Sequence, residues 1–188
     1  LSAPAQGAAL AGTISLAAQA SDNVGVERVV FLIDGVAVSA VSAPPYAYAW
    51  DSKQHADGPA AITARAYDAA GNTVEARVTV ALDNAAPALG PITVSALSST
   101  TANISWTANE PADALVEFGT STAYGLQVRD AALAAAHTLL LTGLSPAITY
   151  HYRVRSKDAL GNEAVSADAV FNTPDTLSPM VSLTAPVE

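Results

Sequence analysis

Apolar and polar residues alternate along most of the chain, which predicts β-strands separated by short turns. Val78, Val80 and Leu82 share one face of such a run, whereas Thr79 and Ala81 share the other, because successive side chains of a strand point to opposite faces. Turn signals recur roughly every 8–12 residues, which is typical of a β-sandwich. The alanine-rich stretch 130–136 is predicted to be a loop.

The predicted strands fall into two sets of similar size. The first set comprises 12–20, 26–33, 36–41, 46–50, 60–68 and 73–82, with a short strand near 8–11. The second set comprises 91–97, 101–107, 113–118, 124–128, 137–142, 148–157 and 164–172. Since a sandwich domain takes about 100 residues, the 188 residues predict an all-β chain of two tandem Greek-key sandwiches.

An internal repeat supports this division. Residues 65–72 read Arg-Ala-Tyr-Asp-Ala-Ala-Gly-Asn, and residues 155–162, 90 positions later, read Arg-Ser-Lys-Asp-Ala-Leu-Gly-Asn. Each copy lies between two alternating runs, so each predicts a β-hairpin. Glycine and asparagine suit such a turn because they accept positive φ angles more readily than other residues.

Proline-rich stretches set the predicted domain limits, because proline ends strands and stiffens linkers. We expect a first domain at 1–83, a linker at 84–91, a second domain at 92–173 and a tail at 174–188. The tail contains Leu183-Thr184-Ala185-Pro186, which echoes Leu1-Ser2-Ala3-Pro4. It is therefore predicted to be a linker that leads into a further repeat, or a tail that donates a strand to a neighbouring copy.

The second half resembles a fibronectin type III domain over roughly 91–173. Trp106 matches the core tryptophan of that family, and 144–150, Leu-Ser-Pro-Ala-Ile-Thr-Tyr, matches its Leu-x-Pro-x-x-x-Tyr corner. The segments Val116–Thr120 and Tyr124-Gly125 look like bacterial members of the family. The resemblance implies that Tyr150 buries its ring and hydrogen-bonds back to the chain.

The first half resembles the bacterial immunoglobulin-like domains of exported surface proteins and modular extracellular enzymes. The residues that carry this resemblance are 20–26, 29–35, 46–50 and 65–72. It implies a spacer, stalk or adhesive role and no particular chemistry.

Composition excludes several functions. The net charge of −9 disfavours binding to nucleic acid, whose phosphates repel an acidic chain. The sequence has no cysteine, which excludes disulfides and cysteine chemistry. It also lacks the run of about 20 apolar residues that a membrane span needs.

Motif searches predict no catalytic residues and no cofactor-binding residues. The chain contains no Gly-x-Ser-x-Gly, no His-Glu-x-x-His and no phosphate-binding glycine loop. His55, His137 and His151 are far apart in the sequence, and we expect all three at the surface. The chain is accordingly predicted not to be an enzyme.

Calcium is the one metal that the acidic turns suit, because it takes about 6–8 oxygen ligands. The candidate ligands are Asp22, Asn23, Asp68, Asp83, Asp113 and Asp158. In an immunoglobulin-like sandwich, the loops that hold Asp22 and Asp68 lie at one end of the domain. The corresponding loops of the second domain hold Asp113 and Asp158. The linker with Asp83 is expected to arrive at that end of the second domain. The alternative is that these side chains only form turns, by bonding to nearby amides.

Tyr46, Tyr48 and Trp50 alternate along one strand and share a face. They fit a sugar-stacking platform, but also an ordinary buried strand face, which we favour because aromatic side chains are usually buried. The sequence thus predicts a secreted or cell-surface bacterial module with a structural, adhesive or filament-forming role. Its expected partners are neighbouring copies or domains, and surface glycans or proteins. The second hypothesis is a carbohydrate-binding or accessory module of a secreted hydrolase.

Overall fold

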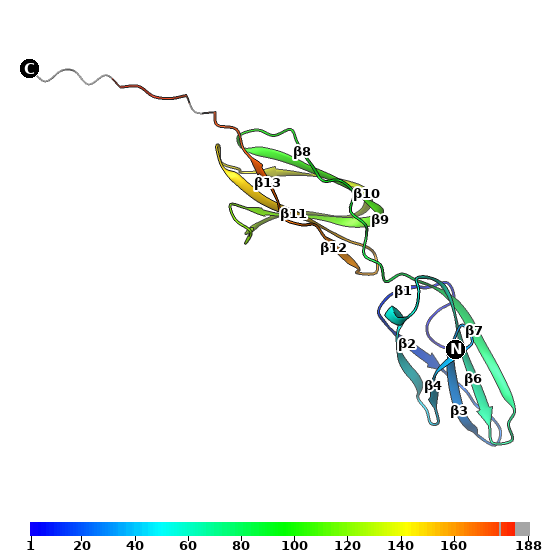
Figure 1. The fold of residues 1–188 in the computed structure, drawn as a ribbon. Coiled ribbons are helices and arrows are strands. Elements are labelled where there is room, and N and C mark those ends of the chain that lie inside the picture. Colours follow the sequence, from blue (N-terminus) through cyan, green and yellow to red (C-terminus); the bar gives the residue numbers. More distant parts are fainter. Residues whose placement is uncertain (177, 183–188) are drawn as a thin grey trace, which may run out of the picture. The chain divides into compact units, whose positions relative to one another are not determined.

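The chain folds as two units, described here from a computed structural model (Figure 1). The structure describes residues 1–176 and 178–182, and unit 1 ends at Ala85 while unit 2 begins at Ala86. Both units are built from strands, which confirms the predicted all-β fold. The repeat of the opening residues at 183–186 and part of the predicted tail lie outside the described residues.

Unit 1 contains seven strands, and each lies close to its predicted position. The strands are β1 (Ala9–Leu10), β2 (Thr13–Ala18), β3 (Val26–Ile33), β4 (Val36–Val41), β5 (Tyr46–Asp51), β6 (Gly58–Asp68) and β7 (Thr73–Leu82). A 3₁₀ turn, Ser52–Gln54, follows β5. The agreement reflects a strong alternation in this half of the chain, which fixes the strands locally.

The strands of unit 1 form two facing sheets. One sheet has the order β1-β7-β6-β3-β4 and the other pairs β2 with β5. The neighbours β3–β6 and β2–β5 are distant in sequence, as expected when the chain passes between the sheets of a Greek-key sandwich. The sheets enclose a core in which Leu16, Phe31 and Ile62 are fully buried.

The aromatic face of β5 belongs to this core. Tyr46 and Trp50 are buried, and Tyr48 packs partly against the same cluster. The core interpretation is therefore confirmed, and the sugar-stacking platform is wrong for these three residues. Their side chains point inward because one face of β5 is turned toward the opposite sheet, and residues two apart share that face.

The described residues of unit 2 form six strands, two of which are much longer than predicted. The strands are β8 (Thr93–Ser95), β9 (Thr101–Gly119), β10 (Leu126–Thr142), β11 (Thr149–Lys157), β12 (Glu163–Val165) and β13 (Ala169–Asn172). Four of them follow the order β10-β9-β11-β12, with β8 beside β9 and β13 beside β11. The core includes Ile104, Trp106, Val116, Leu141 and Val154.

The predicted loop at 130–136 is wrong, because β10 continues through this stretch. Ala134 pairs with Ala112 and Ala136 with Thr107, with a register shift on each side of the first pair. These irregularities bend the strand pair without ending it. The two strands expected at 101–107 and 113–118 likewise join into the single long β9, whereas the single run expected at 164–172 divides into β12 and β13.

The tyrosine corner of unit 2 is confirmed. Tyr150 is buried, and its hydroxyl accepts a hydrogen bond of 2.9 Å from the backbone N–H of Ser145. The ring stacks on Phe171 at a centroid distance of 5.6 Å. The corner therefore joins the turn before β11 to the last strand of the unit.

Residues of the predicted linker 84–91 make contacts within the two units. In unit 1, Oδ1 of Asn84 accepts hydrogen bonds from the backbone N–H of Gly12 and the hydroxyl of Ser52. In unit 2, the backbone N–H of Ala88 donates to Oδ1 of Asn109, and that of Gly90 donates to the carbonyl of Thr107. The first and last parts of this stretch are thus anchored in the units themselves.

Candidate functional site

The turn between β6 and β7 is closed by the carboxylate of Asp68. This carboxylate accepts hydrogen bonds from the backbone N–H of Asn72 at 2.8 Å and from its side-chain amide at 2.6 Å. These bonds favour the charged form and hold the pKa of Asp68 below its ordinary value. Gly71 has a φ of 89°, a conformation that glycine adopts at little cost.

Asp22 closes a second turn at the same end of unit 1. Its carboxylate accepts hydrogen bonds from the backbone N–H groups of Val24 at 2.9 Å and Gly25 at 3.1 Å, and these bonds lower its pKa. Asp22 and Asp68 both line a surface pocket of about 160 Å³. The structure therefore brings these two predicted ligands together, with the exposed Asn23 in the same turn as Asp22.

The repeated turn of unit 2 uses the same hydrogen bonds in a more enclosed setting. Asp158 accepts from the backbone N–H groups of Leu160 and Asn162 at 2.8 and 2.9 Å, and from the side-chain amide of Asn162 at 2.7 Å. Asp158 is only 8% exposed. Its carboxylate therefore satisfies amide groups of the half-buried residues Leu160 and Asn162, to which water has reduced access.

Asp113 lies beside this turn, and both of its carboxylate oxygens accept protein hydrogen bonds. Oδ1 accepts from the backbone N–H of Lys157 at 2.8 Å, and Oδ2 accepts from the guanidinium of Arg129, also at 2.8 Å. Carboxylate oxygens of Glu110 and Asp158 lie within 4.8 Å of each other in this unit. The guanidinium of Arg129 already supplies positive charge here, which reduces the attraction for a metal cation.

Asp83, the remaining predicted ligand, follows β7 in unit 1 and accepts a 3.3 Å hydrogen bond from the backbone N–H of Ala85. All five aspartates among the predicted ligands accept hydrogen bonds, and for Asp22, Asp68, Asp83 and Asp158 these come from nearby amides, as the turn-forming alternative describes. Asp113 differs: it lies within β9 and not in the loop where it was predicted, and its partners are distant in sequence. Calcium binding stays a prediction, and within unit 1 Asp22 and Asp68 are the two predicted ligands that line one pocket.

His137 is buried, so the expectation of a surface position is wrong for this histidine. It is 8% exposed, stands opposite Trp106 in the β9–β10 pair and lies 5.1 Å from it between ring centroids. Its Nε2 is buried without a hydrogen-bond partner among the described residues. Burial disfavours the charged imidazolium and lowers the pKa of His137.

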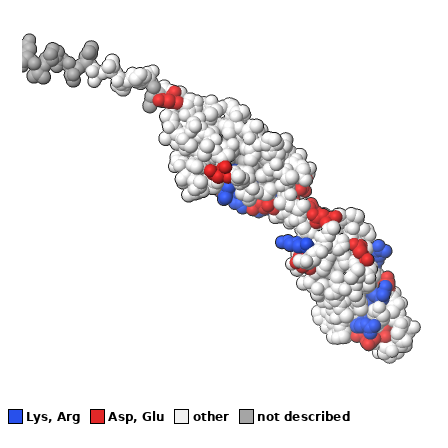
Figure 2. Space-filling model, in the orientation of Figure 1, with Lys and Arg blue, Asp and Glu red and all other residues white. Residues whose placement is uncertain are grey.

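Charged pairs line the outer side of the β9–β11–β12 sheet, a feature that strand periodicity did not single out. The guanidinium of Arg153 donates to Glu117 at 2.6 Å, and that of Arg155 donates to Glu163 at 2.7 Å. Arg155 lowers the pKa of Glu163 through this bond. Elsewhere the surface of unit 2 seen in Figure 2 is mostly neutral. A cross-strand comparison of Glu117 with Arg153, which are register partners, would have predicted the first pair.

Tyr124 lies beside these charges, with two side-chain contacts and a close approach of its backbone to Gly119. Its hydroxyl donates to Asp168 at 3.1 Å, and the guanidinium carbon of Arg153 lies 4.8 Å from its ring centroid. A Cβ added at Gly119 would lie 1.7 Å from the carbonyl oxygen of Tyr124, so only glycine permits this approach. Tyr124, Gln127, Glu117 and Arg153 line a pocket of about 290 Å³.

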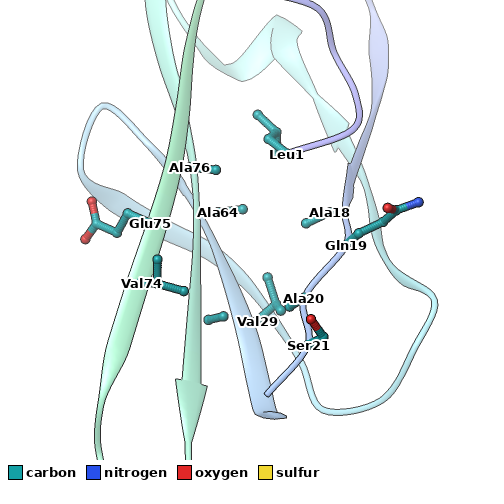
Figure 3. Close-up of a pocket in the computed structure, with 11 residues that line it drawn as sticks. Leu1, Ala18, Gln19, Ala20, Ser21, Val29, Ala64, Val74, Glu75 and Ala76 are labelled. Atoms are coloured by element: carbon teal, nitrogen blue, oxygen red, sulfur yellow. The ribbon is translucent and has the colours of Figure 1, made fainter. Parts of the chain in front are cut away.

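A pocket of unit 1 opens between its two sheets, next to the strand edges of β2 and β7 (Figure 3). It measures about 300 Å³. Small side chains line most of it, and Leu1 lies at one end. The lining residues are Leu1, Ala18, Gln19, Ala20, Ser21, Val29, Ala64, Ala66, Val74, Glu75 and Ala76.

Comparison with known families divides the chain as the structure does. Residues 1–64 match the model of the bacterial Ig domain, and residues 87–173 match that of the purple acid phosphatase N-terminal domain. Among the described residues, no helix has the length and apolar character needed to cross a membrane.

Known proteins similar to the chain include an enzyme and several multi-domain structures. Exoglucanase B of Cellulomonas fimi is 34% identical over 139 residues, covering 64% of this chain, which spans 12% of that protein. The FN1–FN3 domains of chicken CNTN1 match 90% of the chain over 63% of their own length, with 14% identity and a TM-score of 0.50. Domains A168–A170 of titin match 91% of the chain over 62% of their own length, with 15% identity and a TM-score of 0.54. Fibronectin(III)-like modules of Clostridium thermocellum CbhA match 96% of the chain over 97% of their own length, with 17% identity and a TM-score of 0.43.

The similarity to the solved structures concerns the fold, since the identities are low. The resemblance predicted from the sequence is confirmed: residues 1–64 are similar to the bacterial Ig domain, and the chain shares its fold with structures built from fibronectin type III domains.

Proposed function

We propose that the chain is a non-catalytic, semi-rigid spacer of an extracellular bacterial protein. The observation that carries this proposal is the use of the polar and aromatic residues within each unit. The carboxylates of Asp68 and Asp158 close turns, and Trp50 and Trp106 fill cores. Carboxylates and tryptophans are the usual components of a catalytic or sugar-binding site, but here they form turns and cores within the fold.

The similarity to exoglucanase B supports an extracellular setting, since the chain resembles a small part of a long enzyme chain. A spacer needs units that fold without a ligand and linkers that limit their movement. The hydrogen bonds of Asn84 in unit 1 and of Ala88 in unit 2 shorten the free part of the connection. A connection of this kind favours a limited range of distances between the ends.

The absence of cysteine permits a direct test by site-specific labelling. Dyes attached to Ala5→Cys and Thr176→Cys, both exposed positions, report the end-to-end distance by single-molecule energy transfer. A spacer gives one narrow distance distribution that persists with EDTA. A broad distribution, similar to that of a control with a flexible glycine-serine insert between residues 85 and 86, contradicts the proposal.

The pocket beside Tyr124 favours a second candidate function, carbohydrate binding. An aromatic ring fixed by Asp168 and Arg153 next to polar side chains has the apolar and polar surfaces that a sugar requires. The similarity to an exoglucanase directs the choice of ligands toward β-glucans.

Affinity electrophoresis in soluble β-glucan and pull-down with cellulose separate the two functions. Retardation that is lost on Tyr124→Ala supports carbohydrate binding. Tyr67→Ala is the matched control, because Tyr67 also lies against an arginine, Arg28, at 4.1 Å, but in unit 1. Equal mobility with and without glucan supports the spacer.

A further inference from the structure

The last part of β10 is a regular strand at the edge of its sheet. Residues 136–142 pair one by one with residues 107–101 of β9, without the register shifts that interrupt β10 before Ala136. Within the described residues of unit 2, β10 pairs with β9 alone. Every second backbone N–H and C=O of 136–142 therefore points away from β9, toward the position of a further strand.

This edge lacks the charged side chains, prolines and bulges that usually protect the edge of a sheet. Residues 136–142 read Ala-His-Thr-Leu-Leu-Leu-Thr. The one ionisable side chain among them, His137, is buried, and burial lowers its pKa. Buried and exposed positions alternate along the segment, and Leu140 is 52% exposed. The segment is therefore a regular, uncharged strand of the kind that accepts a partner strand.

The strands beside this edge are uncharged as well. Neither β8 nor residues 101–107 of β9, which pair with it, contain Lys, Arg, Asp or Glu. The Lys and Arg residues of unit 2 all lie outside these segments, at Arg129, Arg153, Arg155 and Lys157. Because the chain has a net charge of −9, two copies repel each other as they approach. An uncharged edge is where this repulsion is weakest.

The edge is also complementary to a second copy of itself. Two antiparallel strands of residues 136–142, related by a two-fold axis at Leu139, pair over the whole length of the segment. Thr138 then lies opposite Leu140 of the second copy, and Ala136 lies opposite Thr142. Because opposite residues share a face of the sheet, exposed side chains meet exposed ones. Thr138 of one copy thus covers part of the exposed Leu140 of the other.

We propose that two copies of the chain associate through residues 136–142, which form an antiparallel strand pair centred on Leu139. The sheet formed by β8, β9 and β10 of one copy then continues into that of the other, and the outward backbone groups of both edges gain partners. Since each copy contributes one short strand, we expect a weak, reversible dimer with a Kd on the order of 0.1 mM. The proposal goes beyond the spacer function and does not depend on it.

Sedimentation velocity of the full chain between about 10 µM and about 1 mM tests the association. Leu140→Lys is expected to raise the Kd at least about tenfold, because it brings two lysines together at the paired edge. Leu126→Lys is the matched control and is expected to leave the Kd unchanged, since Leu126 is 53% exposed on the same strand but lies outside the paired segment. A chain that stays monomeric at about 1 mM overturns the proposal, as do equal losses in the two variants.

A second variant keeps the test valid if Leu140→Lys does not fold. The signal of fluorine-labelled Trp106, the core tryptophan of unit 2, shows whether each variant keeps the native fold. Thr142→Lys, at another exposed position of the same strand face, is expected to weaken the dimer in the same direction. A folded Thr142→Lys chain that associates as strongly as the unchanged chain contradicts the proposed strand pair.

Disulfide cross-linking tests the register, since the chain has no cysteine of its own. The single variants Thr138→Cys and Leu140→Cys are mixed in equal amounts, one of them carrying a mass tag, and then oxidised. Because Thr138 lies opposite Leu140 of the second copy, the mixed dimer is expected to form well above its statistical share. A mixture of Thr138→Cys with Leu126→Cys is the control and is expected to show no such excess. A statistical distribution of dimers in the first mixture overturns the register.

Discussion

The same turn occurs in both units, but its surroundings differ. In unit 1 the Asp68–Asn72 turn lies at an exposed end, and Asp22 lines the same pocket. In unit 2 the Asp158–Asn162 turn is enclosed, with Asp158 8% exposed. The neighbouring Asp113 there bonds to Arg129 and to the backbone of Lys157. One sequence motif thus closes a solvated hairpin in one unit and a buried junction of strands in the other.

The difference shows that a turn motif specifies which hydrogen bonds form, but not how much they contribute to the free energy of unfolding. In both turns the aspartate accepts from the backbone and side-chain amides of the asparagine four residues later. Water can replace the lost bonds at the exposed turn, whereas it reaches the part-buried amides around Asp158 less easily. The following predictions test this contrast, and they run from the largest expected effect to the smallest.

Asp158→Ala is expected to have the largest effect, a loss of about 3 kcal/mol in the free energy of unfolding of unit 2. The variant leaves the backbone N–H groups of Leu160 and Asn162 unpaired beside buried structure. Each unit has one tryptophan, Trp50 or Trp106, so fluorine-labelled tryptophan gives one NMR signal for each unit during urea unfolding. An unchanged Trp106 transition would contradict the assigned role of the turn.

Asp68→Ala is the matched change in unit 1 and is expected to cost clearly less. Its carboxylate is exposed to water, which also solvates the N–H of Asn72 after the substitution. The Trp50 signal is expected to shift to slightly lower urea, while the Trp106 signal stays in place. A loss equal to that of Asp158→Ala would remove the distinction between the two turns.

Acidification is expected to weaken unit 2 through His137. The folded-state pKa of His137 lies below its ordinary value of 6.5, so the unfolded chain binds the proton first. Stability is complete above pH 6.5 and falls as the pH drops from 6.5 toward the lowered folded-state pKa. Asp113 and Asp130 lie near enough to oppose part of this shift.

Urea unfolding at pH 7 and pH 5.5 measures this effect through the Trp106 signal. His137→Gln, which does not titrate in this range, is expected to reduce the difference between the two pH values. A difference that persists unchanged in this variant would assign the pH dependence to other groups.

Calcium is expected to produce the smallest effect, and to act on unit 1. Asp22 and Asp68 share a pocket in unit 1, whereas Arg129 occupies the carboxylate of Asp113 in unit 2. Binding in the range of about 0.1–1 mM, as calcium binds to extracellular modules, would raise the unfolding midpoint of unit 1 slightly. Asp22→Asn is expected to abolish this shift, and a midpoint that EDTA leaves unchanged would exclude the site.

Much of the fold was predictable because its signals are local. The alternation of Val78, Val80 and Leu82 placed β7 correctly, and Tyr150 formed the expected corner. The stretch 130–136 was missed because alanine has little strand preference of its own. It becomes part of β10 only because β9 lies alongside it and supplies hydrogen-bond partners, as the Ala134–Ala112 pair shows.

The candidate sites were predictable in residue type but not in setting. The sequence indicated which aspartates close turns, because the spacing of Asp, Gly and Asn is a local signal. It could not show that Asp158 is buried and Asp68 exposed, nor that His137 lies against Trp106. These properties depend on neighbours that are distant in sequence, and side-chain alternation carries no information about those neighbours.

The sequence by itself therefore determined the two-sandwich architecture, the strands of unit 1 and the hydrogen bonds of the repeated turn. Only the tertiary structure decided which copy of that turn is buried, which aromatic residues fill the cores, and where unit 1 leaves an apolar pocket beside two strand edges. The physical reason is that strand and turn formation depend on residues a few positions apart. Burial and cavities arise only when separate sheets pack against each other.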